Sequence, residues 1–132
     1  MSNESRPTSL LPHRAPFLFL EKIVALDPGK SAQALHYVAE GSDNEVFPEV
    51  LVIEALAQTG ACALLAQKEL RQKTAYFGGI KQASFKGQVV SGDILELSVT
   101  LIKCKQNIGL GKGIAKVNGQ VVCQAELTFI LG

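Results

Sequence analysis

Regular alternation of apolar and polar residues predicts long antiparallel strands in the second half of the chain. In residues 94–105, Leu95, Leu97 and Val99 alternate with polar side chains, and residues 120–131 repeat this two-residue period. The strands predicted over the whole chain are Phe17–Leu26, Ser31–Ala39, Ala75–Phe85, Ile94–Lys105, Ile108–Val117 and Gln120–Leu131. Asn118-Gly119 between the last two strands is the sequence signal of a type I′ hairpin turn.

One segment has instead the pattern of a buried helix, from Val50 to about Gln72. It is rich in small residues and apolar on nearly every side until Gln67, and a helix of that kind is buried rather than laid on a surface. Pro48 suits a helix entry, and Glu49 suits the positive end of the helix dipole. Two strands, a buried helix and then long strands predict an α+β fold, in which a curved antiparallel sheet wraps around one long central helix.

The remaining segments are short and polar. Residues 1–9 are predicted to be a flexible arm, and Glu40–Glu49 a turn-rich loop. The length of 132 residues corresponds to a single domain that covers the whole chain.

Composition narrows the classes of function. Hydrophobic residues make up 47% of the chain and charged residues 19%, which excludes a disordered chain and indicates more apolar surface than a monomer needs. A net charge of +1 argues against a nucleic-acid binder. Cys62, Cys104 and Cys123 lack the spacing of metal ligands and are interpreted as buried, reduced thiols of a cytoplasmic protein. We therefore expect no metal, no cofactor and no membrane span.

Three ordered sequence blocks carry a resemblance to a known family. They are LPHRAPFL at 11–18, PEVLVIEALAQ at 48–58, and a third block that runs from Tyr76-Phe77-Gly78-Gly79-Ile80 to Val89-Val90-Ser91-Gly92-Asp93. From about Leu10 to Leu131 the chain resembles the beta-hydroxyacyl-acyl carrier protein dehydratases of fatty-acid synthesis, which have the hot-dog fold. The resemblance implies a lyase that acts on 3-hydroxyacyl thioesters, with acyl carrier protein or acyl-CoA as its partner.

The chain departs from this family in the loop before the helix. The family carries its catalytic histidine there, whereas Glu40–Glu49 is several residues shorter and contains no histidine. Glu49 also replaces the glycine that precedes the family's helix. His13 matches a structural position of the family, and we interpret His36 as an edge or interface histidine. The base of the reaction therefore stays unidentified.

Glu54 and Gln58 are the candidate catalytic residues. A carboxyl on a buried helix tends to keep its proton, and a raised pKa suits a general acid. By resemblance, Glu54 protonates the departing 3-hydroxyl group. The alternative is a structural carboxylate bonded to Gln58, one helical turn further on. Gln58 either orients Glu54 or a water, or binds backbone across a dimer. Cys62 shares this face, but no base is placed near it in the sequence.

The resemblance also implies surfaces for the substrate and its carrier. The candidate substrate-binding residues are Glu49, Val50, Phe77, Gly78 and Gly79. The two glycines either line the acyl tunnel or pack against the helix. The candidate residues for docking a carrier protein are Arg71, Lys73, Lys81 and Lys86, which are otherwise a solvated charged face. We expect a homodimer joined edge to edge; a trimer of dimers and a heterodimer with a complete homologue are the other assemblies considered.

Three functions follow from these observations. The first is a 3-hydroxyacyl-thioester dehydratase, with activity that is weak or altered because the base is missing. The second is a hot-dog thioesterase that uses Glu54 without a histidine. The third is a non-catalytic subunit that binds acyl carriers or pairs with a complete homologue.

Overall fold

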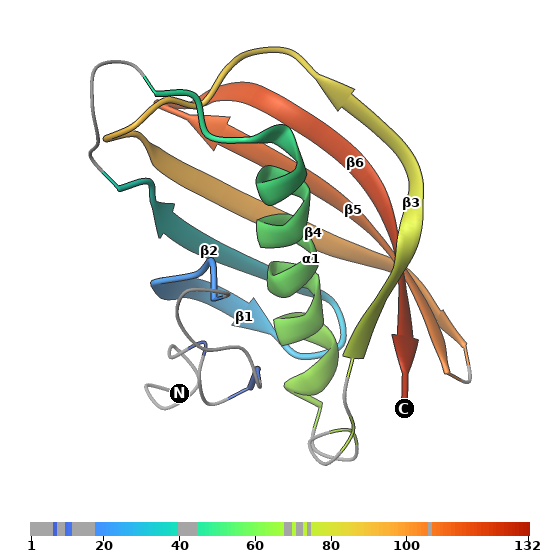
Figure 1. The fold of residues 1–132 in the computed structure, drawn as a ribbon. Coiled ribbons are helices and arrows are strands. Elements are labelled where there is room, and N and C mark those ends of the chain that lie inside the picture. Colours follow the sequence, from blue (N-terminus) through green and yellow to red (C-terminus); the bar gives the residue numbers. More distant parts are fainter. Residues whose placement is uncertain are drawn as a thin grey trace.

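A curved antiparallel sheet wraps around a central helix in the computed structural model (Figure 1). The structure describes residues 7, 10–11, 18–39, 45–67, 70, 73, 75–105 and 107–132. His13, Arg71, most of the predicted arm at 1–9 and residues 40–44 lie outside this part. The described elements are β1 Lys22–Asp27, β2 Ser31–Tyr37, α1 Glu49–Leu65, β3 Ala75–Phe85, β4 Ile94–Lys105, β5 Ile108–Val117 and β6 Gln120–Leu131.

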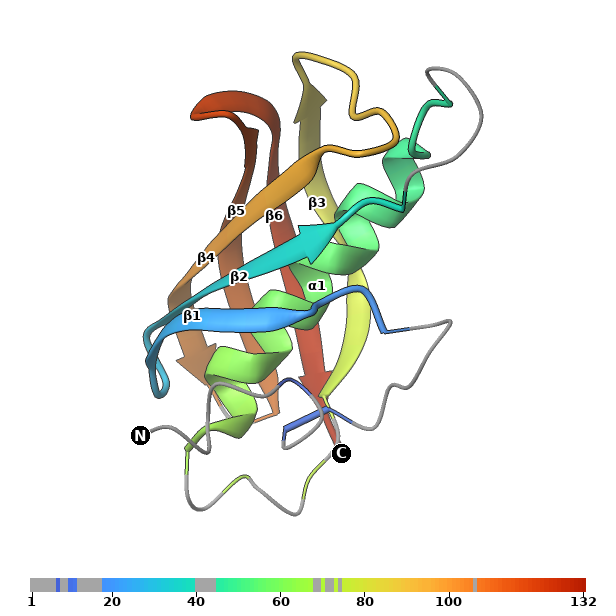
Figure 2. The same cartoon turned by 90° about the vertical axis from the view of Figure 1, so that its left-hand side faces the viewer.

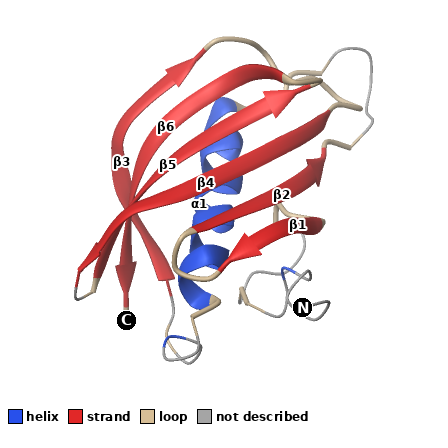
Figure 3. Ribbon diagram, turned by 180° about the vertical axis from the view of Figure 1, so that it is seen from behind, coloured by secondary structure: helices blue, strands red, loops and turns tan. Residues whose placement is uncertain are grey.

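The strand order of the described sheet is β1-β2-β4-β5-β6-β3, and every neighbouring pair is antiparallel. Seen from behind, the strands cross the helix obliquely and cover it (Figure 3). Strand β3 pairs with β6, the last strand of the chain, and forms one edge of the sheet. Along the chain, the helix follows the two early strands and precedes the four later ones, which is the predicted order of the elements.

The predicted boundaries of the last four strands are confirmed. Asn118 and Gly119 have φ angles of 52° and 79°, the two positive values that a type I′ turn requires. Strand β3 runs through Gly78 and Gly79 with an irregularity in its register, and Gly79 has a φ of 151°. The glycines thus bend this strand without ending it.

Helix α1 lies close to the concave face of the sheet because small residues separate the two backbones (Figure 2). A Cβ atom added at Gly60 of α1 would lie 2.4 Å from the Phe129 ring of β6. A Cβ atom added at Gly113 of β5 would lie 3.2 Å from the Leu56 side chain. Side chains from α1 and the sheet together form the buried core.

Three predicted boundaries are wrong by two residues or more, and the smallest difference is in β2, which ends at Tyr37 instead of Ala39. The helix ends at Leu65 instead of about Gln72, because the Gln67 side-chain amide donates to the carbonyl of Leu64 and satisfies an acceptor of the last turn. The first strand begins at Lys22 instead of Phe17. Phe19 lies outside β1, where its backbone N–H donates to a side chain of α1 instead of to a neighbouring strand.

Candidate active site

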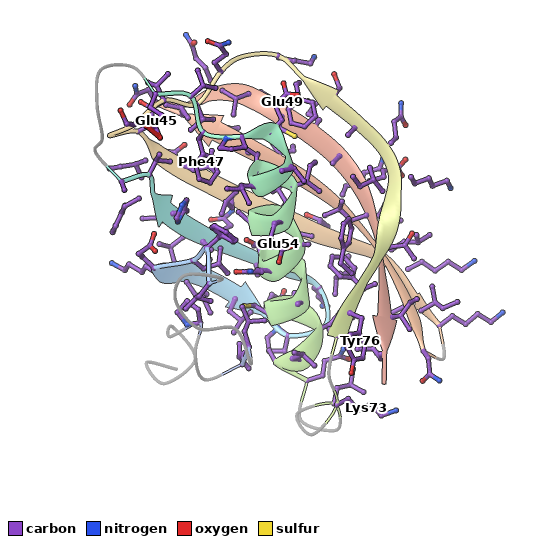
Figure 4. The ribbon with its side chains drawn as sticks, viewed as in Figure 1. Glu45, Phe47, Glu49, Glu54, Lys73 and Tyr76 are labelled. Atoms are coloured by element: carbon purple, nitrogen blue, oxygen red, sulfur yellow. The ribbon has the colours of Figure 1, made fainter. Side chains whose placement is uncertain are left out.

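Glu54 lies midway along α1, on the side of the helix that the sheet leaves open (Figure 4). Every other residue from Val52 to Leu65 of this fully described segment is buried. The predicted burial of Glu54 is therefore wrong for a single chain, since its side chain is partly exposed. Glu54 is therefore the one partly exposed residue in an otherwise buried run of the helix.

The Glu54 carboxylate is held in place by Gln58. The Gln58 amide nitrogen Nε2 donates to Glu54 Oε2 at 2.9 Å, and Gln58 Oε1 accepts the backbone N–H of Phe19 at 2.8 Å. Gln58 is 1% exposed, so its orientation is fixed by these two bonds. The one Gln58 side chain therefore both orients Glu54 and binds a backbone group, and both partners belong to the same chain.

A small cavity adjoins the Glu54 carboxyl group. Its volume is about 30 Å³, room for about one water molecule. It is lined by Glu54, Ala57, Gln58, Ala61, Ala75, Phe77 and Phe129. Phe77 belongs to the edge strand β3 and pairs with Phe129 of β6. The predicted residues Glu54, Gln58 and Phe77 are thus brought together around a space that is too small for an acyl chain.

Glu49 borders a different cavity, of about 150 Å³. This cavity lies beside the first turn of α1 and is lined mainly by apolar side chains, namely Val46, Phe47, Glu49, Val52, Phe85, Gly87, Gln88, Val89, Val122 and Cys123. The helix begins at Glu49 after an extended Pro48, and no side chain of Pro48 caps it. Val50 is 70% exposed and lines neither this cavity nor the one beside Glu54.

Gly78 and Gly79 lie away from the Glu54 cavity. A Cβ atom at Gly78 would lie 3.0 Å from the Ile130 side chain, and one at Gly79 would have no neighbour within 4 Å. Packing against the helix is therefore not what requires glycine here. Their role in binding substrate stays a prediction.

The predicted docking lysines are spread along the whole edge strand. Lys73 precedes β3, Lys81 lies within it and Lys86 follows it, so a strand of 11 residues, up to about 36 Å long when straight, separates the outer two. Lys73 lies at the opposite end of the molecule from Glu49 (Figure 4). One basic patch on a single chain therefore does not contain all three.

His36 is not the edge histidine that the sequence analysis expected. Strand β2 pairs with β1 on one side and β4 on the other, and His36 is 8% exposed. Its Nδ1 lies 2.8 Å from Glu21 Oε1, and the same Glu21 oxygen accepts the backbone N–H of Tyr37. Sequence reasoning did not identify this pair, because 15 residues separate Glu21 from His36.

The three cysteines are free thiols in two different environments. Burial raises the pKa of Cys62 to about 12, and burial together with the nearby Glu49 carboxylate raises the pKa of Cys123 to about 11. Cys104 is exposed, so the expectation of three buried thiols is wrong for this residue. A thiol nucleophile reacts as its thiolate, and the raised pKa makes Cys62 unsuited to that role.

Metal ligation and membrane insertion were also considered. No three His, Cys, Asp or Glu side chains gather around a common point among the residues with described positions. Across the same residues, no helix is both long and apolar enough to cross a membrane.

A curved antiparallel sheet wrapped around one central helix is the architecture of a hot-dog protein. Residues 11–126 match the model of the FabA-like domain. The chain belongs to this family, and the family and fold predicted from the three sequence blocks are confirmed.

Two relatives span nearly the whole chain. The 3-hydroxyacyl-(acyl-carrier-protein) dehydratase FabZ of Ligilactobacillus salivarius is 49% identical, over 93% of this chain and 94% of its own. The FabZ of Clostridium botulinum strain Loch Maree is 48% identical, over 93% and 91%. The first match runs over 131 positions, whereas 93% of 132 residues is about 123, so about eight positions of that relative have no counterpart here.

A solved structure confirms the fold at low sequence identity. The dehydratase heterocomplex ApeI:P from Xenorhabdus doucetiae superimposes with a TM-score of 0.83 and 18% identity, over 96% of this chain and 91% of that chain.

Proposed function

We propose that the protein is a 3-hydroxyacyl-thioester dehydratase that acts on substrates carried by an acyl carrier protein. The observation that carries the proposal is the Glu54 carboxyl group, held by Gln58 on the open side of α1 in a chain 49% identical to a FabZ dehydratase. In this reaction Glu54 donates a proton to the 3-hydroxyl group, which leaves as water. A base removes a proton from C2, and the electrons of that C–H bond form the C2=C3 double bond.

A second copy of the chain completes the substrate channel in this proposal. The cavity beside Glu54 holds about one water, and its outer wall is Phe77 on the edge strand β3. The residues that pair with Phe77, Ile80 and Phe85 are buried ones of β6, so these three side chains lie on the core face of the sheet, yet they are exposed. Exposed apolar side chains on an open sheet edge favour an edge-to-edge homodimer.

The carrier protein approaches this edge strand. Lys73, Lys81 and Lys86 are spaced along β3 from its start to its end. In an antiparallel pair of β3 strands, Lys86 of one subunit comes close to Lys73 of the other. The dimer thus provides the local basic surface that a single chain lacks, and an acidic carrier is its complement. A cytoplasmic location belongs to the same proposal.

The test is a pair of carboxyl-to-amide variants assayed with a 3-hydroxyacyl chain on an acyl carrier protein. Glu54→Gln should lower kcat for enoyl product by about 100- to 10,000-fold. The matched control Glu96→Gln changes an exposed carboxylate of β4 and should leave turnover unchanged. Wild-type turnover that survives Glu54→Gln contradicts the proposal.

The same reaction mixture separates the other two functions. A thioesterase releases free thiol, whereas dehydration leaves the thioester intact. A non-catalytic subunit binds the acyl carrier but forms no product until a complete homologue is added.

A further inference from the structure

The dehydration needs a base, and the only histidine whose position the structure describes has the surroundings of one. His36 Nδ1 lies 2.8 Å from Glu21 Oε1. An ionised carboxylate only accepts hydrogen bonds, so in the neutral ring the proton lies on Nδ1 and the lone pair lies on Nε2. The Glu21 carboxylate is itself anchored by the backbone N–H of Tyr37. A carboxylate that fixes the tautomer of a histidine is the device that prepares a general base.

Two phenylalanines hold the His36 ring in place. The Phe19 ring meets it edge-on, with centroids 5.8 Å apart, and the Phe47 ring is tilted against it at 5.3 Å. The His36 side chain is 10% exposed. Within the described part of the chain, Nε2 has no hydrogen-bond partner. A buried ring nitrogen without a partner is costly unless something uses its lone pair.

The two phenylalanines beside His36 also contact the candidate active site: Phe19 through a bond to Gln58, and Phe47 as part of a cavity wall. The backbone N–H of Phe19 donates to Gln58 Oε1, and Gln58 in turn donates to Glu54. Phe47 precedes α1 and lines the apolar cavity of about 150 Å³ beside the first helical turn. The Phe19 that contacts His36 is thus bonded to the residue that holds the proposed acid. The Phe47 that contacts His36 lines a cavity in which an acyl chain can lie.

We infer that His36 is the base of the dehydration and that Glu21 positions it. This inference rests on the proposed function. Nε2 takes a proton from C2, the electrons of that C–H bond form the C2=C3 double bond, the C3–O bond breaks, and the Glu54 carboxyl group protonates the departing hydroxyl to give water. Water then carries the proton from His36 back to the Glu54 carboxylate. His36 thus supplies from β2 what the histidine-free segment 40–49 does not.

Steady-state kinetics of four variants test the assignment. His36→Gln should lower kcat by about 100- to 10,000-fold and leave KM within about a factor of three. Glu21→Gln keeps the hydrogen-bond acceptor and loses the charge, and it should lower kcat at least about tenfold. The double variant should be no slower than His36→Gln alone, because Glu21 acts through His36. His13→Gln, the change of the chain's other histidine, should retain wild-type turnover.

A second readout protects the test from a folding defect. His36→Ala leaves space for a ring, and added imidazole should restore part of its kcat, whereas a purely structural loss would not respond. Thermal unfolding of each variant shows whether the fold is kept. His36→Gln with wild-type kcat, or a loss that falls on His13→Gln instead, overturns the assignment of His36 and leaves the proposed function standing. A wild-type protein that dehydrates no 3-hydroxyacyl thioester overturns both.

Discussion

Gln58 donates to the Glu54 carboxylate at 2.9 Å from one helical turn away, and a backbone group from a distant segment fixes which end of its amide does so. Because Oε1 accepts the Phe19 N–H, only the amide nitrogen faces Glu54. The hydrogen bond from Gln58 thus sets the orientation of the carboxyl group that we propose as the acid.

Replacing Gln58 tests this relationship. We expect Gln58→Leu to destabilise the fold by about 1–3 kcal/mol, because the Phe19 N–H loses its acceptor in a part-buried site. We also expect a lower kcat with little change in KM, since Glu54 loses its orienting donor. Urea unfolding and steady-state kinetics measure the two effects. Thr59→Val removes the neighbouring hydroxyl bond to Ala55 and should affect stability alone. Equal kinetic losses in both variants would argue against an orienting role.

The close approach of α1 to β6 makes Gly60 sensitive to a single methyl group. We expect Gly60→Ala to destabilise the fold by about 1–3 kcal/mol, because its Cβ would lie 2.4 Å from Phe129. Gly87→Ala is a matched control, since its Cβ would meet Val122 at an ordinary 3.4 Å. Thermal unfolding compares the two. The double variant Gly60→Ala with Phe129→Leu should recover part of the loss, and an unchanged Gly60→Ala would show that the helix sits further from the sheet.

The cysteines should divide into one reactive and two protected thiols. We expect an aromatic disulfide reagent at neutral pH to modify Cys104 alone in the native protein and all three thiols in denaturant. Burial raises the pKa of Cys62 from 9.0 to about 12, so the unfolded chain loses a proton there that the folded chain retains. The free energy of unfolding should therefore fall as the pH rises above about 9.

Two variants isolate the contribution of Cys62 to this alkaline loss. Cys62→Ala should flatten the dependence of the melting temperature on pH between about 9 and 12, although the variant is less stable overall. Cys104→Ala should leave the slope as it is. A slope that is the same in both variants would assign the alkaline loss to other groups.

The proposed dimer predicts a position-dependent response to charge. We expect Ile80→Lys on β3 to raise the dimer dissociation constant at least about tenfold, or about 1.4 kcal/mol, because it buries a charge at the joined edge. Ile94→Lys changes an equally exposed isoleucine of β4, away from that edge, and should have no effect. Sedimentation velocity over a concentration series measures both. Dissociation of the Ile94→Lys protein instead would place the interface elsewhere.

The sequence predicted the elements that depend on local pattern. The alternation in 94–105 and 120–131 and the Asn118-Gly119 turn define strands β4, β5 and β6, because each pattern reports on its own neighbours. The small, apolar residues of α1 predicted a buried helix, and Gly60 of that helix lies close to Phe129 of the sheet.

Contacts between distant segments were not predictable in the same way. The bond from Phe19 to Gln58 joins positions 39 residues apart, and it explains why residues 18–20 leave the strand pattern. The exposure of Glu54 depends on which side of α1 the sheet leaves open, which periodicity does not determine for a helix that is apolar all round. The Glu21–His36 pair depends on β1 and β2 lying side by side in their observed register.

Because β3 pairs with the last strand, β6, the sheet can be completed only late in the synthesis of the chain. When β3 emerges from the ribosome, its partner β6 lies 35 or more residues downstream and has not yet emerged. Helix α1 emerges even earlier, with an apolar surface that the later strands cover in large part. The nascent chain therefore exposes its most hydrophobic segment until translation is nearly complete, and we expect its yield to depend on chaperones that shield such segments.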